Sequence, residues 1–115
     1  MTGHTSPAPL SEASFFILLS LASRPKHGYA VLKDAELLSE GRITLSVSTL
    51  YTSLGRLQEQ GLIERLDVED EEPTPGLPRK VYRLSHQGRA ALEAEAWRLG
   101  RLLAAYNRRL GAEGT

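Results

Sequence analysis

Four short hydroxyl side chains and one arginine lie close together in a segment with helical periodicity. They are Ser48, Thr49, Thr52, Ser53 and Arg56. A helix exposed only to water usually carries Glu and Lys at such positions. Hydroxyls donate hydrogen bonds to phosphate oxygens and base edges without steric bulk, and an arginine can contact a guanine through two hydrogen bonds. The pattern favours a surface that approaches DNA closely; an ordinary solvated face or a protein-binding helix stays open as an alternative.

The sequence contains no arrangement of residues typical of an enzyme or a metal site. The three histidines, His4, His27 and His86, lie far apart, and neither a G-x-S-x-G nor an H-E-x-x-H motif occurs. The acidic run from Glu69 to Glu72 lacks the alternating ligands and the glycine of a calcium loop. With no cysteine, the chain has no thiolate nucleophile and no zinc-finger ligand set. We therefore expect no enzymatic activity, no metal and no cofactor.

The composition is that of one soluble domain. The chain has 115 residues, 41% hydrophobic and 24% charged, with 14 basic and 14 acidic residues. A net charge of zero argues against nonspecific attraction to a polyanion. The charge is nevertheless segregated, because residues 59–78 carry seven acids and one base whereas residues 79–109 carry eight bases and two acids. This segregation indicates a polar face that serves a function.

Neither a membrane span nor a secretory signal is predicted. The longest apolar run, Phe15 to Leu19, is far shorter than the roughly 18–20 residues that cross a bilayer. Residues 1–10 have no basic cluster before an apolar segment and no small-residue cleavage pattern. We expect a cytoplasmic protein without a membrane partner, in which residues 1–10 form a disordered arm.

Periodicity and capping residues predict three helices around the hydroxyl-bearing segment. The first follows an N-cap at Ser11 and is apolar nearly all round, as in a helix buried between others. The second begins near His27 and carries apolar residues at three-residue spacing. The third follows an N-cap at Ser46 and ends before Gly61. Its apolar stripe consists of Val47, Leu50, Tyr51, Leu54 and Leu57.

Two strands and a fourth helix complete the predicted elements. Residues 62–68 and 81–84 alternate like strands, and the proline-rich stretch between them indicates a hairpin with a long tip. Ser85 then caps a helix over residues 86–110. Its apolar residues repeat at heptad spacing and are Leu92, Ala96, Leu99, Leu103, Tyr106 and Leu110. The repeat spans under three heptads, so packing of this helix on its own domain stays an alternative.

Three helices followed by a two-stranded hairpin is the order of a winged helix-turn-helix. In that fold the third helix lies in the major groove and the hairpin touches the flanking backbone. The predicted fold is mainly α with a small β-hairpin, a winged helix-turn-helix plus one long C-terminal helix. Its parts are a disordered arm (1–10), the DNA-binding domain (11–84), the closing helix (85–110) and a frayed tail (111–115).

Three motifs are specific enough to indicate a family. They are His27-Gly28-Tyr29, the segment Ser46-x-Ser48-Thr49-Leu50-Tyr51-x-x-Leu54-x-Arg56-Leu57-x-x-x-Gly61-Leu62-Ile63, and Arg79-Lys80-x-Tyr82-Arg83-Leu84-Ser85-x-x-Gly88-Arg89. Together they resemble the PadR family of bacterial transcriptional regulators, and the single closing helix is similar to the short subfamily that dimerises through this helix. The resemblance implies a homodimeric repressor of a two-half-site operator in double-stranded DNA, often released by a small aromatic effector.

The resemblance extends the predicted DNA surface beyond the third helix. It implies contacts from the start of the second helix, where helix N-termini suit phosphate, and from the basic side of the wing. The predicted surface comprises Lys26, His27, Tyr29, Ser46, Ser48, Thr49, Tyr51, Thr52, Ser53, Arg56, Arg79 and Lys80. Tyr51 has an alternative role in the core with its hydroxyl at the rim, and for His27 we favour a structural role in the turn. The heptad residues Leu92 to Leu110 form the implied dimer interface.

The chain departs from the family pattern at two places. Val47 and Ser48 stand where relatives usually have Pro and Gly, and Ser48 allows a less close backbone approach than Gly would. The acids from Glu69 to Glu72 at the wing tip would be repelled by phosphates, so we expect the tip to point away from DNA. Trp97 is the candidate for stacking on an aromatic effector between dimerised helices, with plain core or interface packing as the alternative. A protein-interaction module and a ligand sensor without operator binding are the alternative functions.

Overall fold

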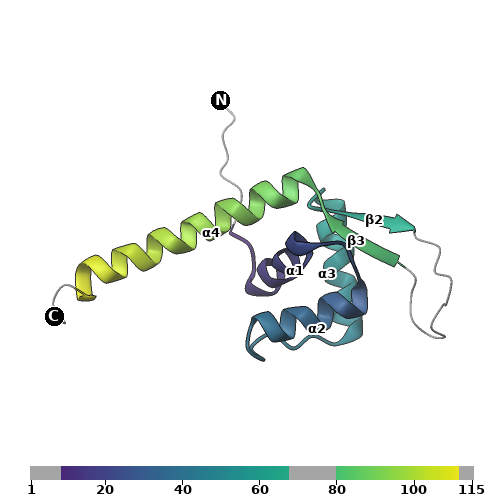
Figure 1. Cartoon of the computed structure of the whole chain (residues 1–115), viewed down its shortest axis with the longest axis horizontal. Helices are drawn as coiled ribbons and strands as arrows, with labels where there is room; N and C mark the ends of the chain where they lie inside the picture. The colour runs from purple at the N-terminus through teal and green to yellow at the C-terminus, as the bar shows by residue number, and fades with distance from the viewer. Residues whose placement is uncertain (1–8, 68–79, 112–115) are drawn as a thin grey trace.

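The computed structural model describes residues 9–67 and 80–111 (Figure 1). Its elements in chain order are α1 (Glu12–Ser23), β1 (Lys26–His27), α2 (Gly28–Leu38), α3 (Val47–Glu59), β2 (Ile63–Asp67), β3 (Lys80–Leu84), α4 (His86–Tyr106) and the π-helical turn η1 (Asn107–Gly111). The predicted fold class, a mainly helical winged helix-turn-helix with one long C-terminal helix, is confirmed. Residues 1–8 of the predicted disordered arm and residues 112–115 of the predicted tail lie outside the described residues.

Serine side chains start three of the helices, as the sequence predicts. Ser11, Ser46 and Ser85 each accept a hydrogen bond from the backbone N–H three residues later, at 3.0, 3.1 and 2.9 Å. Each bond satisfies one of the backbone donors that a helix leaves unpaired at its start. The beginnings of α1, α3 and α4 are therefore determined by local sequence.

The core forms around α1, which packs against α2, α4 and β3. Ile17 and Leu18 of α1 are fully buried, and they join Val31 of α2 and Leu50 and Leu54 of α3 in one cluster. The prediction of a buried first helix is confirmed. Removing a leucine side chain from such a core costs about 2–5 kcal/mol, so this cluster holds α3 firmly against the domain.

The sheet has one strand more than the predicted hairpin. Its order is β1-β3-β2, all antiparallel, with Lys26 paired to Tyr82 and His27 to Val81. A strand of two residues has no alternation to detect, which is why the sequence placed residue 27 at the start of a helix. Figure 1 shows β2 and β3 extending from the helical body on the side opposite to the free end of α4. We call the β2–β3 pair the wing.

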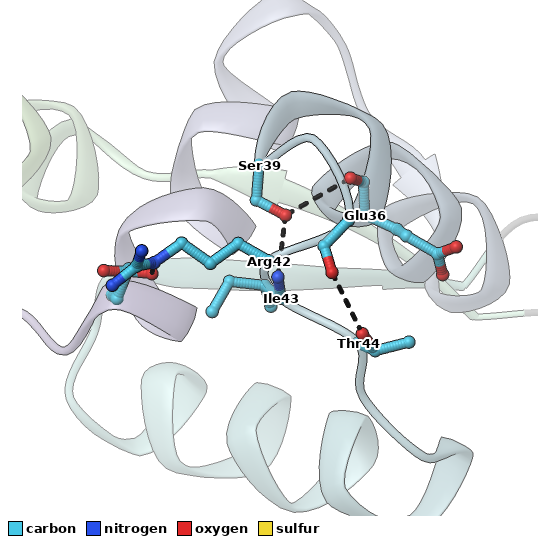
Figure 2. A network of polar contacts seen from close by, with 7 residues as sticks. Glu36, Ser39, Arg42, Ile43 and Thr44 are labelled. Atoms are coloured by element: carbon cyan, nitrogen blue, oxygen red, sulfur yellow. Dashed lines mark hydrogen bonds and ion pairs between the residues drawn. The ribbon is translucent and has the colours of Figure 1, made fainter.

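The turn between α2 and α3 is held by a polar network around Ser39 (Figure 2). Its hydroxyl donates to the Glu36 carbonyl at 3.2 Å and accepts from the Ile43 N–H at 2.8 Å. Thr44 donates to the Gly41 carbonyl at 3.3 Å, and Arg42 forms an ion pair with Glu12 of α1. These bonds fix the angle between the two helices of the helix-turn-helix.

Replacing Ser39 with alanine is expected to lower the free energy of unfolding by about 1–3 kcal/mol. Ser39 is buried, so the variant leaves the Ile43 N–H without its partner in a place with little access to water. Urea denaturation at fixed protein concentration measures the effect. Thr44→Ala is the matched control in the same turn, because its hydroxyl is exposed and it should change stability by less than about 0.5 kcal/mol. Equal losses in the two variants would contradict the assigned role of Ser39.

The two halves of α4 lie in different environments. Leu92 is 7% exposed and belongs to the domain core, whereas every residue from Leu99 to Gly111 is exposed. The helix therefore begins as part of the domain and then leaves it, as Figure 1 shows. Across residues 9–67 and 80–111, no helix combines the length and hydrophobicity that crossing a membrane requires.

Candidate nucleic-acid interface

The outer face of α3 is exposed, and its inner face forms the core. Ser48, Thr49 and Thr52 are exposed, while Leu50, Leu54 and Leu57 are buried. The predicted division of this helix is confirmed for these residues. Two residues depart from this division. Val47, in the first turn of α3, is 56% exposed although the sequence placed it on the apolar stripe, and Ser53, predicted on the exposed face, is half-buried.

Several hydroxyls of this face are already hydrogen-bonded within the helix. Ser46 accepts from the Thr49 N–H at 3.1 Å and donates to the Thr49 hydroxyl at 2.9 Å. Thr52 donates to the Ser48 carbonyl at 3.0 Å. With its proton used inside the helix, the Thr52 oxygen offers a lone pair outward, which suits an amino group on a base edge rather than a phosphate. The Ser46 hydroxyl is likewise occupied by its role as the N-cap of α3.

Tyr51 lies on the flank of α3 that meets the start of α2. A Cβ atom built on Gly28 would lie 2.5 Å from the Tyr51 hydroxyl oxygen, so a larger residue at this position would displace the ring. The side chain is half-buried and packs against the core, and burial raises the pKa of its hydroxyl above the ordinary value. The phenol is therefore neutral near pH 7. The geometry agrees with core packing that leaves the hydroxyl at the rim, beside the first turn of α2.

Lys26 is placed differently from the prediction. Its side chain is buried, and its ammonium donates to the Ser20 carbonyl and to the Ser23 hydroxyl at the end of α1. The carboxylate of Asp34 on α2 lies 3.7 Å away. A cation suits the carbonyl groups at the C-terminus of a helix, so Lys26 ties α1, β1 and α2 together. The prediction that Lys26 belongs to the DNA surface is therefore wrong.

The other residues at the start of α2 remain near the surface. His27 is half-buried, precedes α2 in the N-cap position and makes no side-chain capping bond. Tyr29 is 45% exposed, and the ammonium of Lys33 lies 5.6 Å from its ring centroid. A backbone N–H cluster, a phenol and a cation thus share this end of the helix, a combination that suits an anion.

The wing contributes one predicted residue within the described chain. Lys80 begins β3 and is exposed, whereas Arg79 and the acidic run from Glu69 to Glu72 lie outside the described residues. The sequence pattern did not single out Arg65, which is exposed on β2. Its position two residues after the buried Ile63 is the signal that could have found it, because alternate strand residues share a face.

Arg56 lies toward the flank of α3 that faces α4. It lines a hollow of about 590 Å³ together with Leu10, Gln60 and Glu95. Glu95 is buried, and Arg98 donates two hydrogen bonds to its carboxylate, at 3.1 and 2.5 Å. These bonds hold the pKa of Glu95 below its ordinary value against the opposing effect of burial, and a backbone bond from Leu10 adds to them. Leu10 packs against the core, so the end of the predicted arm is held by the domain.

The predicted dimer residues divide into two groups. Leu92 belongs to the core of its own domain, which corrects its assignment to the interface. The remaining members are exposed, namely Ala96, Leu99, Leu103 and Tyr106, which share one side of α4, and Leu110 in the π-helical turn η1 that follows it. We call them the α4 seam. An apolar row of this kind on a projecting helix is unusual for a surface that faces water alone.

Trp97 lies on the other side of α4 from this seam. It is two residues from Leu99, or about 200° around the helix, and it is 65% exposed. The guanidinium of Arg101 lies 4.9 Å from its ring centroid. The tryptophan is thus held in a cation–π contact on the outer side of the helix.

Within the described residues, no group of three or more His, Asp or Glu side chains is placed to hold a metal ion.

Comparison with solved structures identifies close neighbours of the fold. A PadR family transcription regulator from Clostridium difficile R20291 aligns with a TM-score of 0.70 at 22% identity, over 87% of this chain and 99% of that one. A PadR-like transcription factor from Bacteroides fragilis aligns with a TM-score of 0.66 at 28% identity, over 83% and 86%. A PadR family transcriptional regulator from Eggerthella lenta aligns with a TM-score of 0.60 at 26% identity, over 86% of this chain and 84% of that one.

Comparison at the level of sequence leads to the same family. The chain is 32% identical over 92 residues to an uncharacterised 37.1 kDa protein in transposon Tn4556 of Streptomyces fradiae, covering 80% of this chain and only 24% of that protein. Residues 17–94 match the family model described as the transcriptional regulator PadR-like family, which is more than half of the chain. On this match and on its winged helix-turn-helix fold, the chain belongs to the PadR-like family of transcriptional regulators.

Proposed function

We propose that the chain is a homodimeric repressor that binds a two-half-site operator with α3 in the major groove. The observation that carries the proposal is the outer face of α3, whose exposed Ser48, Thr49 and Thr52 are left uncovered by the chain's own described atoms. Small side chains of this kind allow the helix to enter the groove and read base edges. The start of α2 on one side and the wing on the other provide contacts to the flanking phosphates.

The α4 seam supports the dimeric part of the proposal. Leu103 is 60% exposed and Tyr106 is 58% exposed on a helix that extends away from its own domain. Pairing this seam with a second copy would cover it and present two α3 helices related by a two-fold axis. Such a pair reads half-sites separated by about 34–36 Å or a multiple of it, which predicts an inverted-repeat operator.

Release of the operator by a small aromatic effector and a cytoplasmic location stay predictions. Trp97, the residue assigned to the effector, faces away from the α4 seam, so pairing through that seam does not enclose its ring. The alternative functions, a protein-interaction module and a ligand sensor without operator binding, differ from the proposal in one respect. Neither requires the exposed face of α3 to bind duplex DNA.

Selection from a randomised pool of DNA duplexes tests the proposed function. The purified protein is expected to enrich an inverted repeat, and Thr52→Glu is expected to weaken binding to that duplex by about 100-fold. The new carboxylate would face bases and phosphates, and such like-charge juxtaposition costs several kcal/mol. Binding is measured by fluorescence anisotropy at fixed salt.

Leu37→Glu provides the matched control for this variant. It introduces the same charge at a residue that is 77% exposed near the far end of α2, and it should leave affinity unchanged. If no duplex is enriched from the pool, or if the two variants weaken binding equally, the assignment of α3 as the reading helix is overturned.

A further inference from the structure

The hydroxyl of Thr52 has a fixed direction of hydrogen bonding. It donates its proton to the backbone carbonyl of Ser48, four residues earlier in α3, at 3.0 Å. A carbonyl oxygen can only accept, so the proton of this hydroxyl is committed to the helix and its oxygen is left with lone pairs. Toward a partner outside the chain, Thr52 is therefore an acceptor.

Thr52 also lies on the outermost line of α3. Its side chain is exposed and lies about 160° around the helix from Leu50 and Leu54, which are fully buried. A partner that approaches the exposed side of α3 contacts this line of the helix first. The outward lone pairs of Thr52 are thus placed where such a partner is met.

Gly55 follows Thr52 by three residues, so the two are neighbours on the surface of the helix. A Cβ atom built on Gly55 would meet open space, so packing within the described part of the chain does not require glycine there. Glycine is nevertheless among the least favourable residues in a helix interior. Its missing side chain leaves room for a base pair to come within hydrogen-bond distance of the short Thr52 side chain.

The major groove offers one kind of donor to an acceptor in this place. Its donors are the amino groups on N6 of adenine and N4 of cytosine, whereas guanine and thymine present acceptors there. An oxygen that faces O6 of guanine or O4 of thymine with its lone pairs gains no hydrogen bond, although both groups have lost water. Phosphate oxygens are acceptors as well. The chemistry of Thr52 therefore favours adenine or cytosine at the base that it meets.

We propose that Thr52 is a specificity-determining residue, which accepts a hydrogen bond from the amino group of an adenine or a cytosine in each half-site. The inference rests on the proposed function, because it requires that α3 lies in the major groove. It adds which chemical group of the operator this residue reads. Gly55 supplies the close approach that a side chain as short as threonine needs.

Thr52→Val and Thr52→Ser form a matched pair of variants for this residue. Valine keeps the branched shape without the hydroxyl, and serine keeps the hydroxyl that bonds to the Ser48 carbonyl. Each protein selects duplexes from a randomised pool, and affinities for single base-pair changes are measured by fluorescence anisotropy at fixed salt. At one position of each half-site, the wild type and Thr52→Ser are expected to prefer adenine or cytosine over guanine and thymine by about tenfold. Thr52→Val should reduce this preference to about twofold or less.

Thr44→Val is the control for the loss of a hydroxyl. Thr44 is also exposed and also donates to a backbone carbonyl, that of Gly41, but it lies in the turn before α3. This variant should leave the preference at every base position unchanged. Thermal unfolding of each variant, followed by circular dichroism, confirms that the domain is folded.

A base analogue tests the amino group itself. At the position that depends on Thr52, the amino base is replaced by an analogue that lacks this group, purine for adenine or pyrimidinone for cytosine. The replacement should weaken binding of the wild type by about tenfold and leave binding of Thr52→Val almost unchanged.

Gly55→Ala tests the close approach. The methyl group should raise the urea midpoint through helix propensity and yet weaken binding to the selected duplex by about tenfold. Gly100→Ala is the matched control, because a Cβ atom there also meets open space, and it should raise the midpoint without changing affinity. Binding of Gly55→Ala as tight as that of the wild type would overturn the close approach.

The outcomes separate this inference from the function on which it rests. If the wild-type protein enriches no duplex, the proposed function fails and reading by Thr52 fails with it. If the wild type enriches an operator and Thr52→Val keeps every base preference, only the assignment of Thr52 is overturned. If the analogue weakens the wild type and Thr52→Val equally, Thr52 does not accept from the amino group and the assigned direction of the bond is wrong.

Discussion

Replacing Gly88 with alanine is expected to lower the free energy of unfolding by about 3 kcal/mol or more, a large part of the roughly 5–15 kcal/mol that stabilises a small domain. A Cβ atom at this position would lie 1.9 Å from the Leu62 carbonyl oxygen and 2.9 Å from its carbonyl carbon. Because both atoms belong to the backbone, no rotation of a side chain relieves the overlap. The first turn of α4 has to move away from the segment between α3 and β2.

This movement would also disturb the hydrogen bonds around the start of α4. Ser85 donates through its hydroxyl to the Gly61 carbonyl at 2.6 Å and through its N–H to the Leu62 carbonyl at 3.1 Å. The Gly88 N–H donates to the Ser85 hydroxyl at 2.9 Å. One methyl group would therefore disturb two bonds that join Ser85 to the segment between α3 and β2, together with the capping bond that starts α4.

Gly100→Ala is the control on the same helix. No atom lies within 4 Å of a Cβ atom built on Gly100, so alanine meets open space and should stabilise the protein by about 0.5–1 kcal/mol through helix propensity. Urea denaturation of both variants at one protein concentration provides the comparison. A Gly88→Ala variant as stable as the wild type would show that α4 does not approach Leu62 closely.

Replacing Leu103 with glutamate is expected to convert the proposed dimer to monomers and to weaken binding to the two-half-site operator by about 100-fold. Leu103 is exposed in the middle of the α4 seam. In a two-fold pair the substitution places two carboxylates in an apolar interface, where unpaired charges are strongly unfavourable. Without the dimer, the second half-site is no longer bound at the high effective concentration that linkage provides.

Ala104→Glu is the adjacent control for this variant. Ala104 is also exposed, but it lies about 100° further around α4, on the side of Arg101 and Trp97. Sedimentation equilibrium is expected to show monomers for Leu103→Glu and dimers for Ala104→Glu, with operator affinity retained by the control. A wild-type protein that sediments as a monomer would contradict the dimeric part of the proposal. Dimers that persist in Leu103→Glu would place the interface elsewhere.

The order of α1 to α4 and of the two wing strands could be predicted because the signals for them are local. The three serine caps lie next to the helices that they start, and each accepts the N–H bond that its position predicts. The spacing of Leu50, Leu54 and Leu57 identifies the buried side of α3 before any neighbour is known. These features depend on residues within about one helical turn of each other, a distance over which sequence spacing determines spatial spacing.

The identity of the partner that covers each side chain was decided by the tertiary structure. Three residues show this. Lys26 was predicted at the surface but is buried and hydrogen-bonded to the end of α1, and Leu92 was predicted in the dimer interface but belongs to the core. Arg65 comes from an acidic segment and is paired with Tyr82 across the wing strands. Periodicity shows which face of an element is apolar, but burial depends on residues distant in the chain. By itself the sequence determined the helices, the two strands of the wing and the face of α3 that stays polar. Only the way in which α1, α4 and β1 pack together decided which charges remain at the surface. Burying a charge costs free energy unless other groups compensate it, and those groups come from separate segments that the fold brings together.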